Sequence, residues 1–393
     1  MKITQVDLIK LKRFAAGSQT PVLCRIWTDE GIYGYGEAGV SIMDFSIGSY
    51  EIMRLFAPMI IGMDPFDNDY IYRKLAGTFW AQGNGGVIMA AISAIDTALW
   101  DIKGKALNMP VCKLLGGKHR SKLRAYASQL QFGWKDPNSR NSPGDLGYLR
   151  EACQKAIDDG FDAVKLDVIQ KNLDGTGVDR LEMKNFIPKR IMNEVVQKMD
   201  VIRDTIGPDV DLIIENHCIT SANTAIQLGQ VIEDYDIMFY EEPCVPFNVD
   251  DYRRVYERVN IPLATGERTY MVAGFKPLID SCTLQVIQPD LGNCGGLTEG
   301  RKICDYADAN GITVQTHTCN TPISVAASLQ FEAAIPNFII HELHTHNTLE
   351  AVTETCIYDY QPVNGYYEVP DLPGIGNELS EKALAEATIE VIK

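Results

Sequence analysis

The chain has 393 residues, of which 46% are hydrophobic and 22% are charged, and its formal net charge is −16 at pH 7. This composition is typical of a globular protein with a large core and excludes a disordered chain. The acidic residues are spread along the sequence, which excludes a nucleic-acid-binding surface because phosphate binding needs a basic face.

The N-terminal part of the chain is predicted to form an α+β domain, residues 1–122. It opens on a strand pattern over 2–10, without the basic leader and apolar core of a signal peptide, so we expect a cytoplasmic protein. Residues 22–38 predict a hairpin around an Asp-Glu-Gly turn. Helical periodicity follows from about 49 to 75 and again over 90–107. No apolar run reaches the roughly 18 residues of a membrane helix, so no membrane partner is expected.

Three segments of this domain, 14–20, 40–49 and 79–86, are rich in glycine, serine and aromatic residues. Loops held on a rigid scaffold often carry specificity, so these segments are candidates for closing over a substrate. The alternative for each of them is a plain connecting loop.

Residues 123–350 are predicted to form a parallel barrel of the TIM type. Short apolar runs bounded by turn signals, the first at 123–129, 162–168 and 210–215, alternate with helical segments of about 10 to 15 residues. The count of such strands reaches eight at 338–342. Repeated βα units make a parallel sheet, and a sheet of eight strands can close on itself.

Two segments break this alternation. Residues 169–189 carry an insertion rich in glycine and aspartate that is longer than a usual βα loop. Residues 351–393 are rich in proline and glycine and too irregular for another βα unit. We predict that this C-terminal segment packs back on the first domain.

Carboxylates and imidazoles recur where the predicted strands end, once every 23 to 27 residues. In a closed barrel the carboxyl ends of all strands lie at one rim, where the active sites of this fold are found. Side chains far apart in sequence would therefore meet in one small volume. The residues are Glu215, Glu241, Glu267, Asp290, His317 and Glu342.

Glu215, Glu241 and Glu267 end three consecutive strands and predict a metal site. Three carboxylates brought together would repel one another unless a cation lay among them. Oxygen ligands on rigid strands suit octahedral Mg²⁺, whereas zinc prefers histidine or cysteine. The 10 cysteines occur singly, without a C-x-x-C pair, which also argues against zinc. We therefore predict Mg²⁺ as the cofactor.

Asp290 and His317 end adjacent predicted strands and predict a general base. A carboxylate bonded to one imidazole nitrogen fixes the tautomer and raises the basicity of the other nitrogen. His217 lies two residues beyond Glu215, at the same rim, where it could protonate a departing hydroxyl. Taken alone, each of these histidines is more often structural.

A metal beside a base predicts a reaction that begins with loss of a proton next to a carboxylate. The metal would stabilise the enediolate that forms, a charge that barely exists in the ground state. The intermediate can then lose a β-hydroxyl, be reprotonated or close a ring. A dehydratase, an epimerase and a cycloisomerase all remain open at this point.

The sequence resembles the enolase superfamily, and within it the acid-sugar dehydratases of the galactonate type in the mandelate racemase branch. The resemblance spans nearly the whole chain and is carried by DEGIYGYGEA, AISAIDTALWDIKGKALNMPVCKLLGG, FYEEP, PLATGER, VIQPDLGNCGGLTEG and PGIGNELSE. It implies a modified TIM-type barrel with an N-terminal capping domain that the C-terminal segment completes. It also implies a homo-oligomer.

The same three metal ligands and the same base are implied by the resemblance, which adds two residues. Glu342, on the eighth strand, would hydrogen-bond the substrate carboxylate. Lys165, on the second strand, would orient that carboxylate. His217 matches the acid of galactonate-type dehydratases, which carry an acidic ligand, one residue and then histidine.

Two positions depart from the pattern of the branch. The first metal ligand is usually aspartate, whereas this chain has the longer Glu215. The second strand of the racemases carries Lys-x-Lys, whereas this chain has Lys165-Leu166-Asp167. Without a second base on the opposite face, dehydration is favoured over racemisation.

We therefore expect a Mg²⁺-dependent hydro-lyase that converts a sugar acid, an aldonate or an aldarate, to a 2-keto-3-deoxy acid. One alternative is an epimerase or cycloisomerase that uses the same intermediate. The other is a non-catalytic sugar-acid-binding or regulatory homologue that has kept the metal site.

Overall fold

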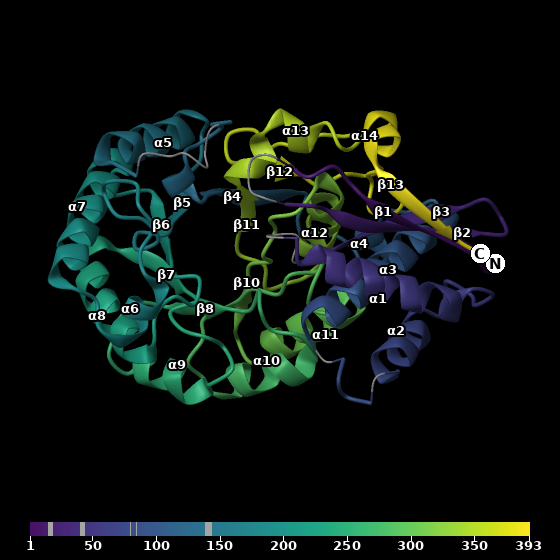
Figure 1. Cartoon of the computed structure of the whole chain (residues 1–393), viewed down its shortest axis with the longest axis horizontal. Helices are drawn as coiled ribbons and strands as arrows, with labels where there is room; N and C mark the ends of the chain where they lie inside the picture. The colour runs from purple at the N-terminus through teal and green to yellow at the C-terminus, as the bar shows by residue number, and fades with distance from the viewer. Residues whose placement is uncertain (15–18, 40–43, 79, 84, 138–143) are drawn as a thin grey trace.

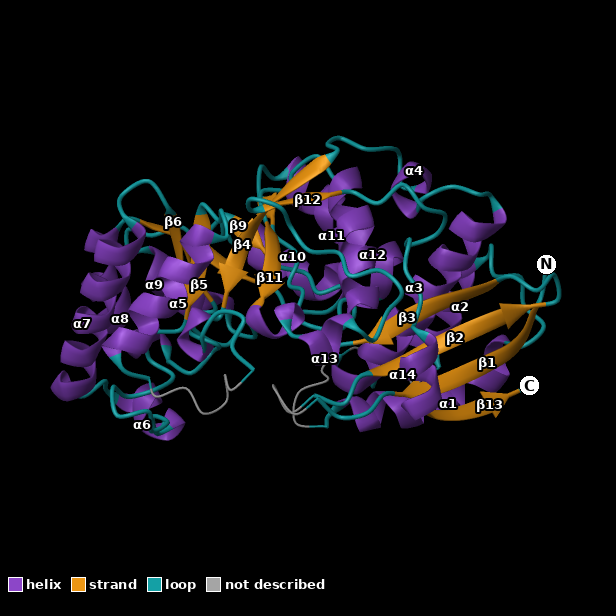
Figure 2. Cartoon of the chain, turned by 90° about the horizontal axis from the view of Figure 1, so that it is seen from above, coloured by secondary structure: helices purple, strands orange, loops and turns teal. Residues whose placement is uncertain are grey.

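The computed structural model of the chain describes residues 1–14, 19–39, 44–78, 80–83, 85–137 and 144–393. An antiparallel sheet covered by helices lies at one end of the molecule, and a curled parallel sheet ringed by helices lies at the other (Figures 1 and 2). Of the loops predicted to cover a substrate, residues 15–18, 40–43, 79 and 84 lie outside the described residues.

The antiparallel sheet has the strand order β13-β1-β2-β3. Strands β1, β2 and β3 confirm the predicted strand and hairpin. Strand β13 comes from the C-terminal segment and pairs with β1, with Ile392 opposite Val6. The first and the last strand of the chain therefore lie side by side (Figures 1 and 2). The strands are β1 (Ile3–Lys10), β2 (Val22–Thr28), β3 (Tyr33–Ala38) and β13 (Thr388–Ile392).

Three helices complete this end of the molecule. The helix predicted over 49–75 is in fact two helices, because Gly62 takes a left-handed φ of 82° and Pro65 follows it. The longest helix packs so closely on β3 that a Cβ on Gly36 would lie 1.8 Å from the Ala94 carbonyl oxygen. The helices are α1 (Ser46–Ile60), α2 (Asn68–Gly77) and α3 (Gly86–Ala106).

Eight parallel strands form the curled sheet, in the order β10-β9-β8-β7-β6-β5-β4-β11. The gap between β10 and β11 is bridged by two backbone hydrogen bonds, Val314 N to Asn337 O (2.8 Å) and Ile339 N to Val314 O (3.0 Å). The strands are β4 (Lys122–Ser128), β5 (Ala163–Leu166), β6 (Asp211–Glu215), β7 (Ile237–Glu241), β8 (Leu263–Thr265), β9 (Val286–Ile287), β10 (Thr313–Val314) and β11 (His341–His344). The predicted barrel is confirmed.

Helices surround these strands, as a TIM-type barrel requires (Figure 1). The principal helices are α5 (Leu146–Asp158), α7 (Lys189–Ile206), α8 (Ala222–Ile232), α9 (Val249–Tyr256), α10 (Met271–Asp280), α11 (Gly296–Ala309) and α12 (Pro322–Ala334). Shorter elements are α4 (Val111–Leu114), α6 (Arg180–Asn185), α13 (Glu350–Thr353), α14 (Glu381–Glu386) and β12 (Tyr366–Glu368), which pairs with β4. None of the described helices combines the length and the apolar composition that crossing a membrane requires.

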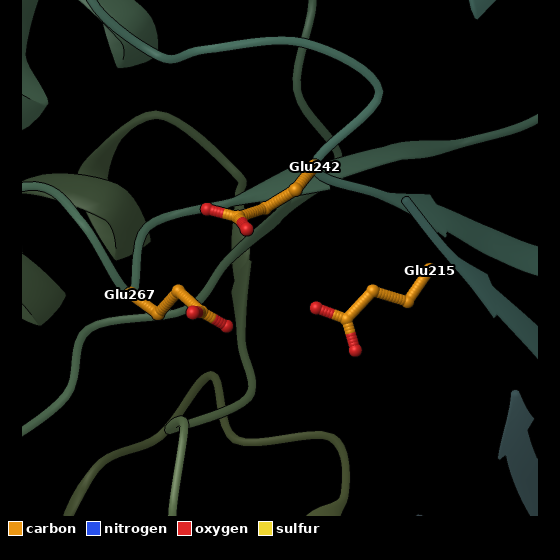
Figure 3. Close-up of side chains that lie close together, drawn as sticks. All are labelled: Glu215, Glu242 and Glu267. Atoms are coloured by element: carbon orange, nitrogen blue, oxygen red, sulfur yellow. The ribbon is translucent and has the colours of Figure 1, made fainter. Parts of the chain in front are cut away.

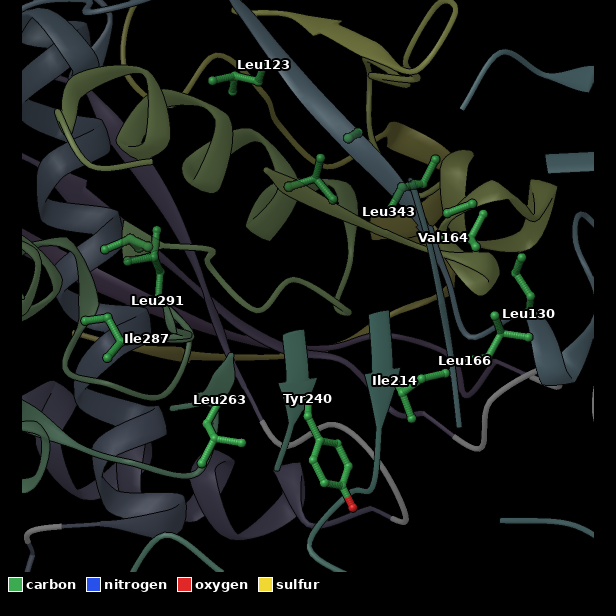
Figure 4. Packing of buried hydrophobic residues seen from close by; sticks show 14 of the residues in the cluster. Leu123, Leu130, Val164, Leu166, Ile214, Tyr240, Leu263, Ile287, Leu291 and Leu343 are labelled. Carbon is green, nitrogen blue, oxygen red and sulfur yellow. The ribbon is translucent and has the colours of Figure 1, made fainter. Parts of the chain in front are cut away.

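Side chains alternate between the two faces of the curled sheet. Outward residues such as Val164, Ile214 and Leu263 pack in the large core between the strands and the helices (Figure 4). Inward residues form a separate apolar layer inside the barrel, made by Tyr126, Ala163, Ile213, Phe239, Ala264, Val286 and Ile340. Because residues two apart in a strand share a face, the next inward residues stand directly above this layer.

Buried carboxylates join the two ends of the molecule. Glu37 on β3 accepts hydrogen bonds from the Thr321 hydroxyl (2.7 Å) and the Ser324 hydroxyl (2.7 Å) on α12 and its cap. Asp96 on α3 accepts from the Thr298 backbone N–H (2.9 Å) on α11. Burial raises the pKa of Glu37 to about 7 and that of Asp96 to about 6, although these hydrogen bonds oppose the rise.

Candidate active site

Three glutamates meet at the carboxyl ends of neighbouring barrel strands. One carboxylate oxygen each from Glu215, Glu242 and Glu267 lies within 4.8 Å of the other two. Figure 3 shows the three side chains reaching toward one another from separate strands. Glu215 is the last residue of β6, Glu242 directly follows β7, and Glu267 follows β8 by two residues. Their convergence is the consequence of a parallel barrel, in which strand ends share one rim.

Glu241 is the predicted third ligand, and the group of oxygens within 4.8 Å of one another contains its neighbour Glu242. Phe239 points into the barrel, so Glu241, two residues on, also points inward, and its Oε1 lies 2.8 Å from Lys165 Nζ. Glu242 leaves the strand with a left-handed φ of 44°, which turns its side chain to the rim. The spacing of strand ends selects the last strand residue and does not reveal this turn.

Lys165 lies among the inward-pointing carboxylates, Glu241 included, that stand above the apolar layer of the barrel. Its Nζ is 3.2 Å from Glu215 Oε2, 2.8 Å from Glu241 Oε1 and 3.0 Å from Glu342 Oε1, and its side chain is 1% exposed. Burial opposes the charge on Lys165, but these three carboxylates outweigh it and raise the pKa well above its usual range. Lys165 is therefore a buried cation that is already paired three times.

Arg268 supplies a second positive charge. Its Nη1 contacts both Glu242 and Glu267. Burial opposes ionisation of Glu267, but Arg268, His317 and His217 hold its pKa down at about 2. For Glu242, burial and the nearby Glu267 raise the pKa to about 7. Neither Glu242 nor Arg268 was predicted, although each stands directly beside a predicted ligand in the sequence.

These carboxylates fit a divalent cation. Glu242 Oε1 and Glu241 Oε2 are buried and have no hydrogen-bond partner among the described residues. Burial and the neighbouring Glu215 also raise the pKa of Glu241 to about 8. Buried oxygens that lack donors and resist ionisation are stabilised by added positive charge. Oxygen ligands at several strand ends suit a hard divalent cation rather than a softer metal.

The predicted pair of Asp290 and His317 is in hydrogen-bonding contact. His317 Nδ1 lies 2.8 Å from Asp290 Oδ2, and His317 Nε2 lies 3.5 Å from Glu267 Oε2. Both residues follow two-residue strands by three positions instead of ending them. After β9, Pro289 has no N–H with which to continue the ladder. Burial disfavours charge on His317, but Glu267 and Asp290 raise its pKa well above the usual range.

His217 forms a second pair of the same kind. Its Nδ1 lies 2.7 Å from Asp167 Oδ2, and its Nε2 lies 3.2 Å from Glu215 Oε1. Burial opposes the charge, but Glu215 and Asp167 raise the pKa of His217 to about 9. Asp167, which had no predicted role, therefore orients His217. One imidazole contacts Glu215 and the other contacts Glu267, so the glutamate group has an imidazole at each side.

Glu342 and Gln129 complete the rim. Glu342 accepts from the Ser128 hydroxyl (2.7 Å) and the Thr318 backbone N–H (3.1 Å). Burial opposes its ionisation, but Lys165 holds its pKa well below the usual range. Gln129, which sequence reasoning missed, donates to Glu215 Oε2 (2.6 Å) and takes a left-handed φ of 66°. A polar residue directly after the first barrel strand was the signal that could have found it.

Family models match both parts of the chain. A model described as the mandelate racemase / muconate lactonizing enzyme N-terminal domain matches residues 3–116. A model described as enolase C-terminal domain-like matches residues 148–383. The second match alone covers more than half of the chain.

Solved and curated proteins resemble this chain over nearly its whole length. A crystal structure of an enolase superfamily member from Salmonella Typhimurium is 44% identical, covers 100% of both chains and has a TM-score of 0.95. D-xylonate dehydratase from Haloferax volcanii is 30% identical over 95% of this chain and 87% of its own length. D-galactarolactone cycloisomerase from Agrobacterium fabrum is 32% identical over 93% of this chain and 90% of its own length.

Proposed function

Because the chain belongs to the mandelate racemase / muconate lactonizing enzyme family of the enolase superfamily, we propose that it dehydrates a sugar acid to a 2-keto-3-deoxy acid. One of the proteins that it resembles is named a D-xylonate dehydratase, which is a hydro-lyase that acts on a sugar acid. The observation that carries the proposal is the pair of imidazoles, His217 and His317, each aligned by its own aspartate beside the glutamate group. Dehydration needs one group to take a proton and another to give one.

Glu215, Glu242 and Glu267 would hold the metal, for which Mg²⁺ is the proposal. Glu241, the ligand that the strand spacing predicts, competes with Glu242 for the third place. A divalent cation bound there would hold the substrate carboxylate and stabilise the negative charge that develops on it when the α-proton leaves. Lys165 would then neutralise the remaining carboxylates of the inward layer.

The proton transfers are assigned to the two histidines. With a divalent cation at the glutamate group, the charge of Glu267 that raises the pKa of His317 would be offset, and the neutral ring, held by Asp290, would take the proton from the carbon next to the carboxylate. The electron pair left on that carbon forms a double bond to the β-carbon as the β-hydroxyl departs, and His217 gives that hydroxyl its proton, so water leaves. The resulting enol becomes the 2-keto acid by moving one proton to carbon 3. Glu342 would donate a hydrogen bond to the substrate carboxylate only in its protonated form, because an ionised carboxylate can only accept hydrogen bonds.

The proposal is tested by screening aldonic and aldaric acids for a 2-keto product with Mg²⁺ present. We expect His317→Asn to abolish turnover while Mg²⁺ binding, followed by calorimetry, is unchanged. His119→Asn, at an exposed position away from the site, is the matched control and should retain full turnover. Activity that survives His317→Asn would remove this histidine from the mechanism, and an inactive parent over the whole library would favour a sugar-acid-binding protein.

Cycloisomerisation is the second candidate, since a cycloisomerase is among the relatives. It would use the same α-proton transfer but would conserve the mass of the substrate, because no water leaves. Mass spectrometry of the products from sugar acids and their lactones therefore separates the two reactions. Exchange of the α-hydrogen with deuterated solvent and no other change would instead indicate an epimerase.

A further inference from the structure

His344 stands at the rim next to Glu342. It ends β11 two residues after Glu342, so both side chains belong to the same, inward face of the strand. The register between β11 and β4 places His344 opposite Ser128, whose hydroxyl donates to Glu342 (2.7 Å). His344 is partly exposed, whereas Glu342 is buried. It therefore lies on the outer side of the carboxylate, where the carbon chain of a bound acid would extend.

The buried imidazole of His346 contacts the ring of His344. His346 is 3% exposed, and its Nδ1 lies 2.7 Å from the Nδ1 of His344. The backbone N–H of His346 also lies 3.2 Å from His344 Nδ1. Two ring nitrogens at hydrogen-bonding distance share one proton, so the two rings cannot both be charged. The contact uses the Nδ1 atom of His344 and leaves its Nε2 for another partner.

Both rings are neutral near pH 7. Burial lowers the pKa of His346 to about 4, although the carbonyls of Cys319 and Asn320 oppose this. Burial and the neighbouring His346 lower the pKa of His344 well below its usual range, although Glu342 opposes this. A neutral imidazole at the rim gives or accepts a hydrogen bond but offers no charge to an anion.

Among the residues that the structure describes, the lysine and the arginine beside the glutamate group already pair with carboxylates, and the His217 and His317 rings pair with Asp167 and Asp290. Lys165 pairs with Glu215, Glu241 and Glu342, and Arg268 contacts two glutamates of the metal group. A second carboxylate buried beside His344 would lose its hydration and meet the negative charge of Glu342. A hydroxyl group at the same place would find a hydrogen-bond partner at little cost.

We propose that His344 determines substrate specificity by binding a hydroxyl of the carbon chain, so that the substrate is a polyhydroxy monocarboxylate, an aldonate, and not a dicarboxylate. This inference rests on the proposed function, because it assumes a sugar acid held at the glutamate group. His346 acts through His344, as the residue that fixes its ring. Gln129, the residue that follows Ser128, is a second uncharged polar side chain at this rim. Its Nε2 lies 3.3 Å from His217 Nε2.

The test compares aldonates with the aldarates of the same configuration at carbons 2 to 5, for example D-gluconate with D-glucarate. Binding to the Mg²⁺-loaded protein is measured by calorimetry, and kcat and KM are measured for each acid. We expect the parent protein to bind and turn over the aldonate at least about tenfold better, a difference that corresponds to the net contribution of about one hydrogen bond between neutral groups.

Three variants separate the role of His344 from a structural one. His344→Gln, which keeps a neutral hydrogen-bonding group, should stay within a few-fold of the parent. His344→Ala should lower kcat/KM for the aldonate about tenfold, mainly through KM, with Mg²⁺ binding unchanged. His344→Lys, which adds a cation, should shift the ratio toward the aldarate.

Preference of the parent for the aldarate would overturn the proposal, and so would an aldonate-to-aldarate ratio that His344→Lys leaves unchanged. The proposed function fails separately if acids bind but none is turned over, and the binding ratios then still decide the role of His344. Binding of neither class of acid to the Mg²⁺-loaded protein would overturn both.

Discussion

Glu215, Glu242 and Glu267 place three carboxylates in a volume that is largely closed to water. Burial and mutual repulsion raise the pKa of Glu242 to about 7, while Arg268 and the two histidines hold Glu267 at about 2. Positive side chains therefore offset part of this charge and leave a site where a divalent cation is stabilised by the remainder. The residue chemistry, rather than any single hydrogen bond, makes the case for a metal.

Replacing each of the two adjacent glutamates separates their roles. Mutation of a residue that only hydrogen-bonds to a metal ligand typically weakens metal binding by roughly 10- to 100-fold. We expect Glu242→Gln to weaken Mg²⁺ binding by more than that. Glu241→Gln, one position away and of the same size, should cost less because Glu241 pairs with Lys165. Calorimetric titration with Mg²⁺ measures both. The reverse order of losses would make Glu241 the third ligand and would require Lys165 to leave it when the cation binds.

At this scale the sequence identified most of the polar rim but not its detailed contacts. The period of strand ends led to Glu215, Glu267 and the pair of Asp290 and His317, because a parallel barrel places every strand end at one rim. The choice between two adjacent glutamates depends on one left-handed backbone angle, which no spacing encodes. Likewise, nothing in the sequence shows that Asp167 reaches His217 from another strand.

Among the elements, the segment that leaves β3 is in direct contact with the loop of the base. Gly39 donates its backbone N–H to the Gly292 carbonyl (2.9 Å), and a Cβ on Gly39 would lie 2.3 Å from Asn293 Oδ1. Asn293 Nδ2 in turn lies 3.3 Å from Asp290 Oδ2, the oxygen that holds His317. The antiparallel end of the molecule therefore helps to position Asp290 and His317, the proposed general base.

Gly39→Ala should displace the Asn293 side chain and loosen Asp290. We expect kcat to fall about tenfold with KM for the acid little changed. The reason is that Asp290, which holds His317, is disturbed, whereas the three glutamates of the metal group are not. The matched test is a double-mutant cycle with Asn293→Ala, which removes the three nearest atoms that the new Cβ would meet. In that background Gly39→Ala should have no further effect. Additive losses would contradict the contact as the cause.

The elements themselves were largely predictable, with errors at their ends. Long periodic segments such as α3 and the hairpin of β2 and β3 follow from pattern alone. The last barrel strands do not, because β9 and β10 have only two residues each and the candidate residues Asp290 and His317 lie on the loops beyond them. The break between α1 and α2 was missed because helical periodicity resumes after Gly62 and Pro65.

For the molecule as a whole, Glu37 and Asp96 join the antiparallel end to the barrel while buried. Their pKa values rise from 4.5 to about 7 and from 3.8 to about 6, so the folded protein keeps protons that the unfolded chain releases. The stability that these groups contribute is fully present below about pH 4 and is lost as the pH rises through 6 and 7. For Glu37 the loss is on the order of 3 kcal/mol.

Glu37→Gln should remove part of this pH dependence. The amide oxygen can still accept from Thr321 and Ser324, but no proton is released, so the free energy of unfolding in urea should fall less between pH 5 and pH 7.5 than in the parent. Glu257→Gln, at an exposed position, is the control and should leave the slope unchanged. An equal slope for Glu37→Gln and the parent would show that Glu37 is ionised throughout this range.

Anomalous diffraction from crystals grown with Mn²⁺ in place of Mg²⁺ tests the central claim most directly, since both cations prefer oxygen ligands. The arrangement of the site predicts one strong peak at roughly 2.0 to 2.3 Å from an oxygen of Glu215, of Glu242 and of Glu267. A peak elsewhere, or no peak at the rim with Mn²⁺ in excess, would contradict it.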